Sequence, residues 1–160
     1  SEGFMTLQAF LDAYRARCSL LIEVKNHDWE PTSRHDIKIQ TTFDLIGKNS
    51  DQGIFVSSFN LESLIYAHHY RPEFSLIYNF EIEQTVTDVQ QVLAVQPFLH
   101  GLCLPIATLS RPMVDLLRTH NKCIAVYTCN SDEEINKAFQ LGVDILISDV
   151  PHKALMMRKT

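Results

Sequence analysis

The residues best suited to chemistry are an acid and a base at the end of one apolar run, Leu20-Leu21-Ile22-Glu23-Val24-Lys25. The run predicts a buried strand, and side chains on a strand alternate between its two faces. Glu23 and Lys25 therefore point the same way, and Leu21 shares their face. A carboxylate in this position can hold a hard cation, and the ammonium beside it can hold an oxyanion. The alternatives are an ion pair between the two, or two solvated charges at a strand end.

Helices and strands alternate along the chain around this run. Apolar spacing and helix caps predict six strands, each followed by a helix, with one further helix in front. The expected strands cover residues 19–24, 53–58, 75–79, 101–104, 123–128 and 143–147. The expected helices cover about 5–17, 34–46, 60–70 and 85–96, then 110 onward, 131–142 and 151 onward. Gly47 and Gly142 are placed to end helices, and Pro112 to lie in a first turn.

This alternation is typical of two architectures, an open doubly wound sheet or an arc of a (β/α)8 barrel. No Gly-rich phosphate loop follows a strand, which counts against a nucleotide-binding sheet. No low-complexity linker divides the 160 residues, so we expect a single domain over 1–160.

Composition excludes several functions. The formal net charge is −5 and the basic residues are scattered, so we expect no nucleic-acid partner. No apolar run reaches membrane-spanning length, so we expect no transmembrane segment.

The spacing of the cysteines matches no zinc pattern; they are Cys18, Cys103, Cys123 and Cys129. Buried free thiols predict a reducing compartment, here the cytoplasm, with disulfides as the alternative.

Four segments together resemble the glycerophosphodiester phosphodiesterase family. Residues 21–25 (Leu-Ile-Glu-Val-Lys) look like its Ile-Glu-Ile-Lys strand, and residues 56–60 (Val-Ser-Ser-Phe-Asn) contain its Ser-Ser-Phe motif. Residues 126–130 (Val-Tyr-Thr-Cys-Asn) are similar to its Trp-Thr-Val-Asn motif. Residues 142–151, which begin Gly-Val-Asp and end Asp-Val-Pro, resemble its closing motif. Each match is weak alone, but the four occur in the right order over nearly the whole chain.

The resemblance implies an incomplete (β/α)8 TIM barrel of about six βα units, corresponding to strands three to eight. It implies a phosphoric diester hydrolase of lipid metabolism, acting on glycerophosphodiesters and releasing glycerol 3-phosphate and an alcohol. The family uses a divalent cation, calcium or magnesium, held by carboxylates at the barrel mouth. In the family a histidine pair handles the protons, and the neighbouring glycerol hydroxyl can attack phosphorus.

Only part of the family's site is carried over to this sequence. Glu23 is implied as a metal ligand, and Lys25, Ser58 and Tyr127 are implied to contact substrate, with Tyr127 standing where the family usually has Trp. The family's His-Arg pair, its Glu-x-Asp pair and its second histidine are not among these 160 residues. A hard cation usually takes at least about six oxygens, so one carboxylate holds it weakly. We therefore assign no catalytic residue and expect this chain alone to be inactive.

Several alternatives stay open. The chain could be a non-catalytic homologue that binds a phosphate ligand or a partner protein, or an unrelated α/β binding domain. A barrel arc has two open edges, which a missing N-terminal portion or a homo-oligomer would cover. Trp29 is expected at the rim as a contact or a loop anchor. Asn130 and Asp149 are expected to cap helices rather than to bind ligand.

Overall fold

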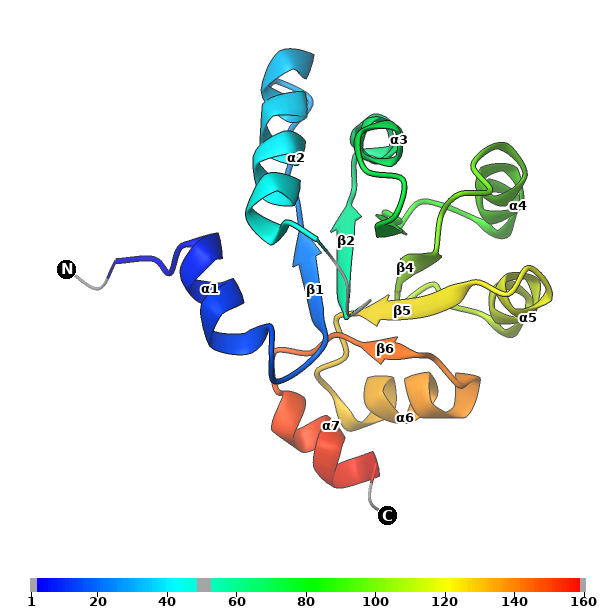
Figure 1. Cartoon of the computed structure of the whole chain (residues 1–160). Helices are drawn as coiled ribbons and strands as arrows, with labels where there is room; N and C mark the ends of the chain where they lie inside the picture. The colour runs from blue at the N-terminus through cyan, green and yellow to red at the C-terminus, as the bar shows by residue number, and fades with distance from the viewer. Residues whose placement is uncertain (1–2, 49–52, 159–160) are drawn as a thin grey trace. The chain divides into compact units, whose positions relative to one another are not determined.

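Helices and strands alternate along the whole chain (Figure 1). A computed structural model describes residues 3–48 and 53–158. The helices are α1 (Leu7–Tyr14), α2 (Thr32–Ile46), α3 (Leu61–Tyr70), α4 (Val86–Val95), α5 (Arg111–Thr119), α6 (Asp132–Leu141) and α7 (Pro151–Arg158). The strands are β1 (Leu20–Glu23), β2 (Ile54–Ser58), β3 (Ser75–Asn79), β4 (Gly101–Pro105), β5 (Cys123–Tyr127) and β6 (Ile145–Leu146). The predicted succession of six strands, each followed by a helix, is confirmed.

Internal contacts divide the chain into two compact units, Ser1–Tyr78 and Asn79–Thr160. In unit 1, β1 pairs in parallel with β2, and β2 with β3. In unit 2, β4 pairs in parallel with β5, and β5 with β6. Parallel strands need a crossover, and a helix supplies it at each of these connections. The single domain expected for residues 1–160 remains a prediction.

The core of unit 1 forms where α2 buries one stripe of its surface. Ile39, Phe43 and Ile46 are almost fully buried, at the helical spacing of three and four residues. The ring of Phe43 lies 4.5 Å from that of Phe74, centroid to centroid. Gly47 then ends the helix at a φ of 69°, a positive value that favours glycine, as the sequence predicted.

Unit 2 is built on β4, every residue of which is buried. Gly101 allows β4 to approach β5 closely, because a Cβ added there would lie 2.2 Å from the carbonyl oxygen of Cys123. Ser131 caps α6, and its side chain accepts a hydrogen bond from the backbone N–H of Glu134. Gly142 ends α6 in the left-handed conformation at a φ of 70°.

The last strand is shorter than predicted. Residues 143–147 were expected to form it, whereas β6 contains only Ile145 and Leu146. The N–H of Val143 bonds to the carbonyl of Ala138 in α6, so Val143 is part of the turn that closes this helix and does not pair with β5. Pairing continues past β6, since the N–H of Ile147 bonds to the carbonyl of Val126.

Two further findings concern membrane-spanning helices and the state of the cysteines. Within the described part of the chain, no helix combines the length and the apolar character that a membrane crossing requires. All four cysteines are free: Cys103 and Cys129 are buried, Cys123 is half-buried and Cys18 is exposed. The thiols are free as predicted, but the predicted burial holds for Cys103 and Cys129 and is wrong for Cys18.

Candidate functional site

The register of β1 with β2 settles which side chains accompany Glu23. Glu23 lies directly opposite Ser57, and Leu21 opposite Phe55. Residues opposite each other in a parallel pair point to the same side of the sheet, so Glu23 and Ser57 are neighbours on one face. Lys25 follows Glu23 by two residues and continues that face beyond the strand. We call this side of the unit 1 sheet the Glu23 face.

Both charged residues of this face are free to bind. Glu23 and Lys25 are exposed. Among residues 3–48 and 53–158, no partner lies within ion-pair distance of either side chain, and they do not pair with each other. The alternative of an internal strand-end ion pair is therefore wrong for the described residues, whereas the alternative of two solvated charges agrees with their exposure. A carboxylate and an ammonium that are both uncommitted can bind a cation and an anion.

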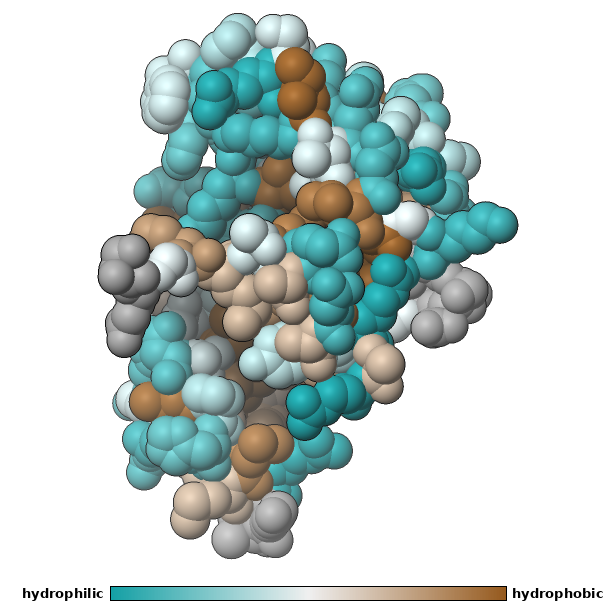
Figure 2. Space-filling model, turned by 60° about the vertical axis from the view of Figure 1, so that its left-hand side comes forward, coloured by the Kyte–Doolittle hydropathy of each residue, from teal (hydrophilic) through white to brown (hydrophobic). Residues whose placement is uncertain are grey.

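A groove of about 450 Å³ runs beside β1 and contains both residues. Its walls are mostly apolar and include Ile37 and Leu45 of α2 and Leu7 of α1. Ile37 and Leu45 are exposed despite their apolar character. Figure 2 shows a face on which apolar side chains interrupt a mostly polar exterior. The Glu23–Lys25 pair thus borders an apolar groove.

The loop after β1 is held by a buried carboxylate, Glu30, whose side chain is only 2% exposed. The ammonium of Lys38 lies 2.6 Å from one carboxylate oxygen of Glu30 and 2.7 Å from the other. Arg34 adds a contact of 2.7 Å. The hydrogen bond from Lys38, with one from the backbone of His27, lowers the pKa of Glu30 to about 2. Glu30 is therefore ionised at any pH near neutrality.

Ser58 lies apart from the Glu23 face. It is fully buried, and its hydroxyl donates to the carbonyl of Val24 at 2.8 Å and accepts from the N–H of Asn60 at 3.1 Å. Alternation along β2 turns Ser58 to the side opposite Ser57. This geometry gives Ser58 a structural role at the end of β2. Its contact with substrate remains a prediction from the family motif.

Tyr127 lies at the carboxyl end of β5 in unit 2, opposite Pro105 of β4. Its ring is half-buried, and its hydroxyl donates a hydrogen bond to the carbonyl of Phe80. The N–H of Phe80 in turn bonds to the carbonyl of Cys103, so the acceptor is itself fixed. Tyr127 is therefore anchored through its hydroxyl, and its contact with substrate remains a prediction.

The remaining candidates have plain structural settings. Trp29 is 81% exposed, and its ring stacks on that of His27 with centroids 5.4 Å apart.

Ser131 rather than Asn130 caps α6. The amide of Asn130 donates to a carboxylate oxygen of Asp149 at 2.8 Å and accepts from the N–H of Asp149 at 2.9 Å. This pair ties the start of α6 to the segment that precedes α7.

The described residues do not by themselves fit a divalent cation. No group of three or more His, Cys, Asp or Glu side chains in residues 3–48 and 53–158 is arranged to hold a metal ion. Ser57, the neighbour of Glu23 on its face, brings no charge. A hard cation needs about six or more oxygens, of which Glu23 could supply one or two.

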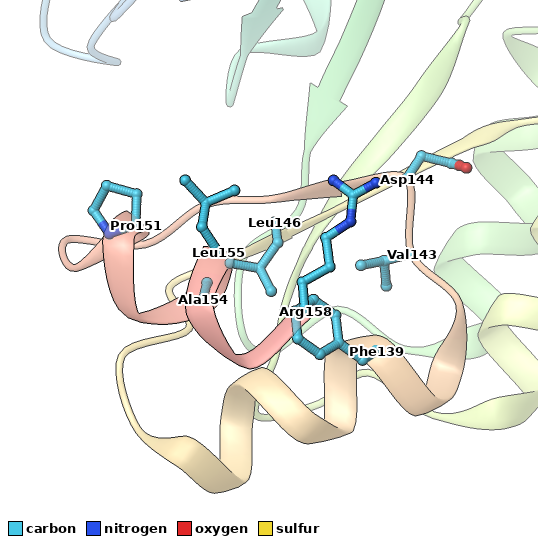
Figure 3. Close-up of a pocket in the computed structure, with 8 residues that line it drawn as sticks. All are labelled: Phe139, Val143, Asp144, Leu146, Pro151, Ala154, Leu155 and Arg158. Atoms are coloured by element: carbon cyan, nitrogen blue, oxygen red, sulfur yellow. The ribbon is translucent and has the colours of Figure 1, made fainter. Parts of the chain in front are cut away.

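A second cavity of about 450 Å³ lies in unit 2 between α6, β6 and α7 (Figure 3). Phe139 of α6 and Leu155 of α7 line it, and Arg158 extends along it. Asp144 at its margin is bound by Arg118 at 2.8 Å. Its lining contains none of the predicted site residues.

Two features of the site escaped sequence reasoning. Ser57 was overlooked in favour of Ser58, because only the register with β1 shows which of the adjacent serines shares a face with Glu23. The Glu30–Lys38 contact, in contrast, could have been predicted from the spacing of charged residues in the sequence. Glu30, Arg34 and Lys38 are spaced four apart, which places them along one stripe of a helix and the residues leading into it.

Parallel strands joined by helices, with exposed charges at the carboxyl end of one strand, define an α/β protein. The profile of the Glycerophosphoryl diester phosphodiesterase family matches residues 1–153. The chain therefore belongs to this family, as its four motifs indicated. A glycerophosphodiester phosphodiesterase of Bacillus subtilis (strain 168) is 24% identical over 149 residues, which cover 91% of this chain and 51% of the relative.

Solved structures of similar proteins show the same fold. A phosphodiesterase from Oleispira antarctica, determined in complex with the product sn-glycerol-3-phosphate, matches with a TM-score of 0.81 and 18% identity. That match covers 96% of this chain and 61% of the other. A glycerophosphodiester phosphodiesterase from Thermotoga maritima matches with a TM-score of 0.71 and 18% identity, covering 98% and 64%.

This chain therefore spans about half the length of the curated relative and under two thirds of each of these two structures. The strands pair in parallel within each unit, which agrees with the predicted partial barrel. Their assignment to strands three to eight of a full barrel remains a prediction.

Proposed function

We propose that this chain carries one part of the active site of a glycerophosphodiester phosphodiesterase. In the intact protein, a glycerophosphodiester is hydrolysed to glycerol 3-phosphate and an alcohol with the help of calcium or magnesium. The observation that carries the proposal is the pair Glu23 and Lys25, exposed and unpaired on one face at the end of β1. Family membership and the names of the similar proteins support an enzyme over a non-catalytic homologue.

Each residue has a definite part in this proposal. The ammonium of Lys25 binds a phosphoryl oxygen, and a charge-assisted bond of this kind contributes about 1.5–3 kcal/mol. The carboxylate of Glu23 supplies one of the oxygen ligands of the cation, and residues outside these 160 supply the others. Tyr127 and Ser58 are proposed to line the substrate site. The four free thiols support a reducing, cytoplasmic setting.

Ligand binding by the chain tests this function. Calorimetric titration with glycerol 3-phosphate is expected to show weak binding, which Lys25→Met weakens by about 10-fold or more. Lys48→Met is the matched control, because Lys48 is an exposed lysine that follows α2. Equal effects of the two substitutions, or no binding by the unaltered chain, would contradict the proposal.

Turnover tests the prediction that the chain is an incomplete enzyme. The 160-residue chain, supplied with calcium or magnesium, is expected to release no glycerol 3-phosphate from a glycerophosphodiester. Release that Glu23→Gln abolishes and Glu133→Gln leaves intact would show that the described residues suffice for catalysis. Glu133 is an exposed glutamate in the first turn of α6 and serves as the control.

A further inference from the structure

The loop between β1 and α2, residues 24–31, is fixed at its centre by His27. The N–H of His27 donates to a carboxylate oxygen of Glu30 at 3.1 Å. Its carbonyl accepts two hydrogen bonds, from the N–H of Glu30 at 2.9 Å and from Nε2 of His35 at 2.9 Å. Both backbone polar groups of His27 are therefore bonded, and the loop cannot move without breaking them.

A single ammonium joins the two ends of this loop, Lys25 near β1 and Glu30 near α2. Lys38 contacts both carboxylate oxygens of Glu30 and also donates to the carbonyl of Lys25 at 3.0 Å. Arg34, the other cation on Glu30, has a side chain that is 65% exposed, and among residues 3–48 and 53–158 it pairs with Glu30 alone. Of the two cations, Lys38 is thus the one that links the buried carboxylate to the residue proposed to bind phosphate.

The network holds a loop in which Glu30 is buried while other side chains face water. Lys25, His27 and Trp29 are all exposed, and Trp29 stacks on His27. A buried carboxylate is costly to remove from water unless cations and donors surround it in one arrangement. Glu30 therefore favours the single loop conformation in which all its partners are in place. A loop that is fixed before binding spares the ligand the entropic cost of ordering it.

We propose that Glu30 and Lys38 are positioning residues, which hold the backbone of Lys25 and Trp29 in the arrangement that receives a phosphodiester. This inference rests on the proposed function for the ligand, while the positioning itself stands on the contacts alone. Lys25 supplies the ammonium for the phosphoryl oxygens. Trp29 offers a fixed aromatic face four residues further along the same loop.

The only tryptophan of the chain reports on this loop directly. Lys38→Gln and Arg34→Gln each remove one cation from Glu30, but only the first also removes the bond to Lys25. We expect Lys38→Gln to lower the fluorescence anisotropy of Trp29 and to weaken binding of glycerol 3-phosphate by about 2- to 10-fold, the cost of ordering one side chain. Arg34→Gln is expected to change either quantity much less, and Lys38→Arg to restore the anisotropy.

The outcomes distinguish a failure of the proposed function from a failure of the positioning role of Glu30 and Lys38. If the unaltered chain does not bind glycerol 3-phosphate, the proposed function fails, while the anisotropy still decides the positioning. Equal anisotropy in the unaltered chain and in Lys38→Gln, with circular dichroism showing both folded, would overturn the positioning. If Lys38→Gln does not fold, Glu30→Gln replaces it, since it removes the charge but keeps an acceptor for His27, and an unchanged anisotropy there would be equally decisive.

Discussion

Glu23 of β1 lies directly opposite Ser57 of β2, on the same face of a parallel pair. Ser57 is 2% exposed, whereas Glu23 is exposed, so the carboxylate projects from a face whose neighbouring position is small and uncharged. This relationship makes the residue opposite Glu23 a place where the charge of the site can be changed.

A second carboxylate at that position should create a stronger cation site. Ser57→Asp places two carboxylates on adjacent strands, which repel each other without a cation and are neutralised by one. We expect the variant to have a lower melting temperature than the unaltered chain in a chelator, and a larger rise on addition of calcium. Ser57→Asn is the uncharged control. A calcium response equal to that of Ser57→Asn would show that the two positions do not cooperate.

The buried carboxylate predicts how the chain responds to acid. The pKa of Glu30 falls from 4.5 to about 2 in the folded state, because Lys38 and the N–H of His27 bind the ionised form. A lowered folded pKa contributes stability that is present above the unfolded pKa and is lost as the pH falls toward the folded one. We expect urea unfolding midpoints to drop between pH about 4.5 and about 2, and to drop less in Glu30→Gln. Glu62→Gln, an exposed glutamate of α3, should keep the full drop.

The four thiols should differ sharply in reactivity. Burial raises the pKa values of Cys123 and Cys129 to about 11, so both stay protonated and unreactive at pH 8. Cys103 is buried, and Cys18 is exposed. Native protein treated with iodoacetamide is therefore expected to gain one adduct quickly, at Cys18, as mass spectrometry would show. Rapid labelling that persists in Cys18→Ser would contradict this order.

Gly101 should be intolerant of a side chain. A Cβ there would lie 2.2 Å from the carbonyl oxygen of Cys123, an impossible approach unless β4 and β5 separate. We expect Gly101→Ala to lower the free energy of unfolding by about 1–3 kcal/mol, the usual range for overpacking. Gly3→Ala, with no atom within 4 Å of the added carbon, should be neutral in the same denaturant titration.

The order of helices and strands could be predicted from the sequence because their signals are local. Gly47 and Gly142 end helices at positive φ values, and Pro112 lies in the first turn of α5. Each depends on the allowed dihedral angles of one residue, which neighbours in space do not change. The shortened β6 was missed because the N–H of Val143 bonds to a helix carbonyl, a choice between two acceptors that spacing does not reveal.

The positions of Ser57 and Ser58 relative to Glu23 could not be predicted from the local sequence. They are adjacent in a strand, and nothing in their identity says which of them faces Glu23. The pairing of β1 with β2 decides it, because a shift of one residue in register would exchange their faces. The role of Glu30 likewise depends on Lys38 reaching across to Lys25, an arrangement of three residues that α2 creates only once it is packed.

By itself the sequence determined the family, the alternation of helices and strands, and the presence of an acid and an amine on one side of β1. These follow from motifs, from the periods of apolar residues and from the alternation of side chains along a strand. Only the tertiary structure decided that Glu23 and Lys25 remain unpaired, that Ser57 accompanies Glu23, and that Lys38 ties Lys25 to Glu30. Those outcomes depend on distances between segments separated in the chain, which packing and strand register set.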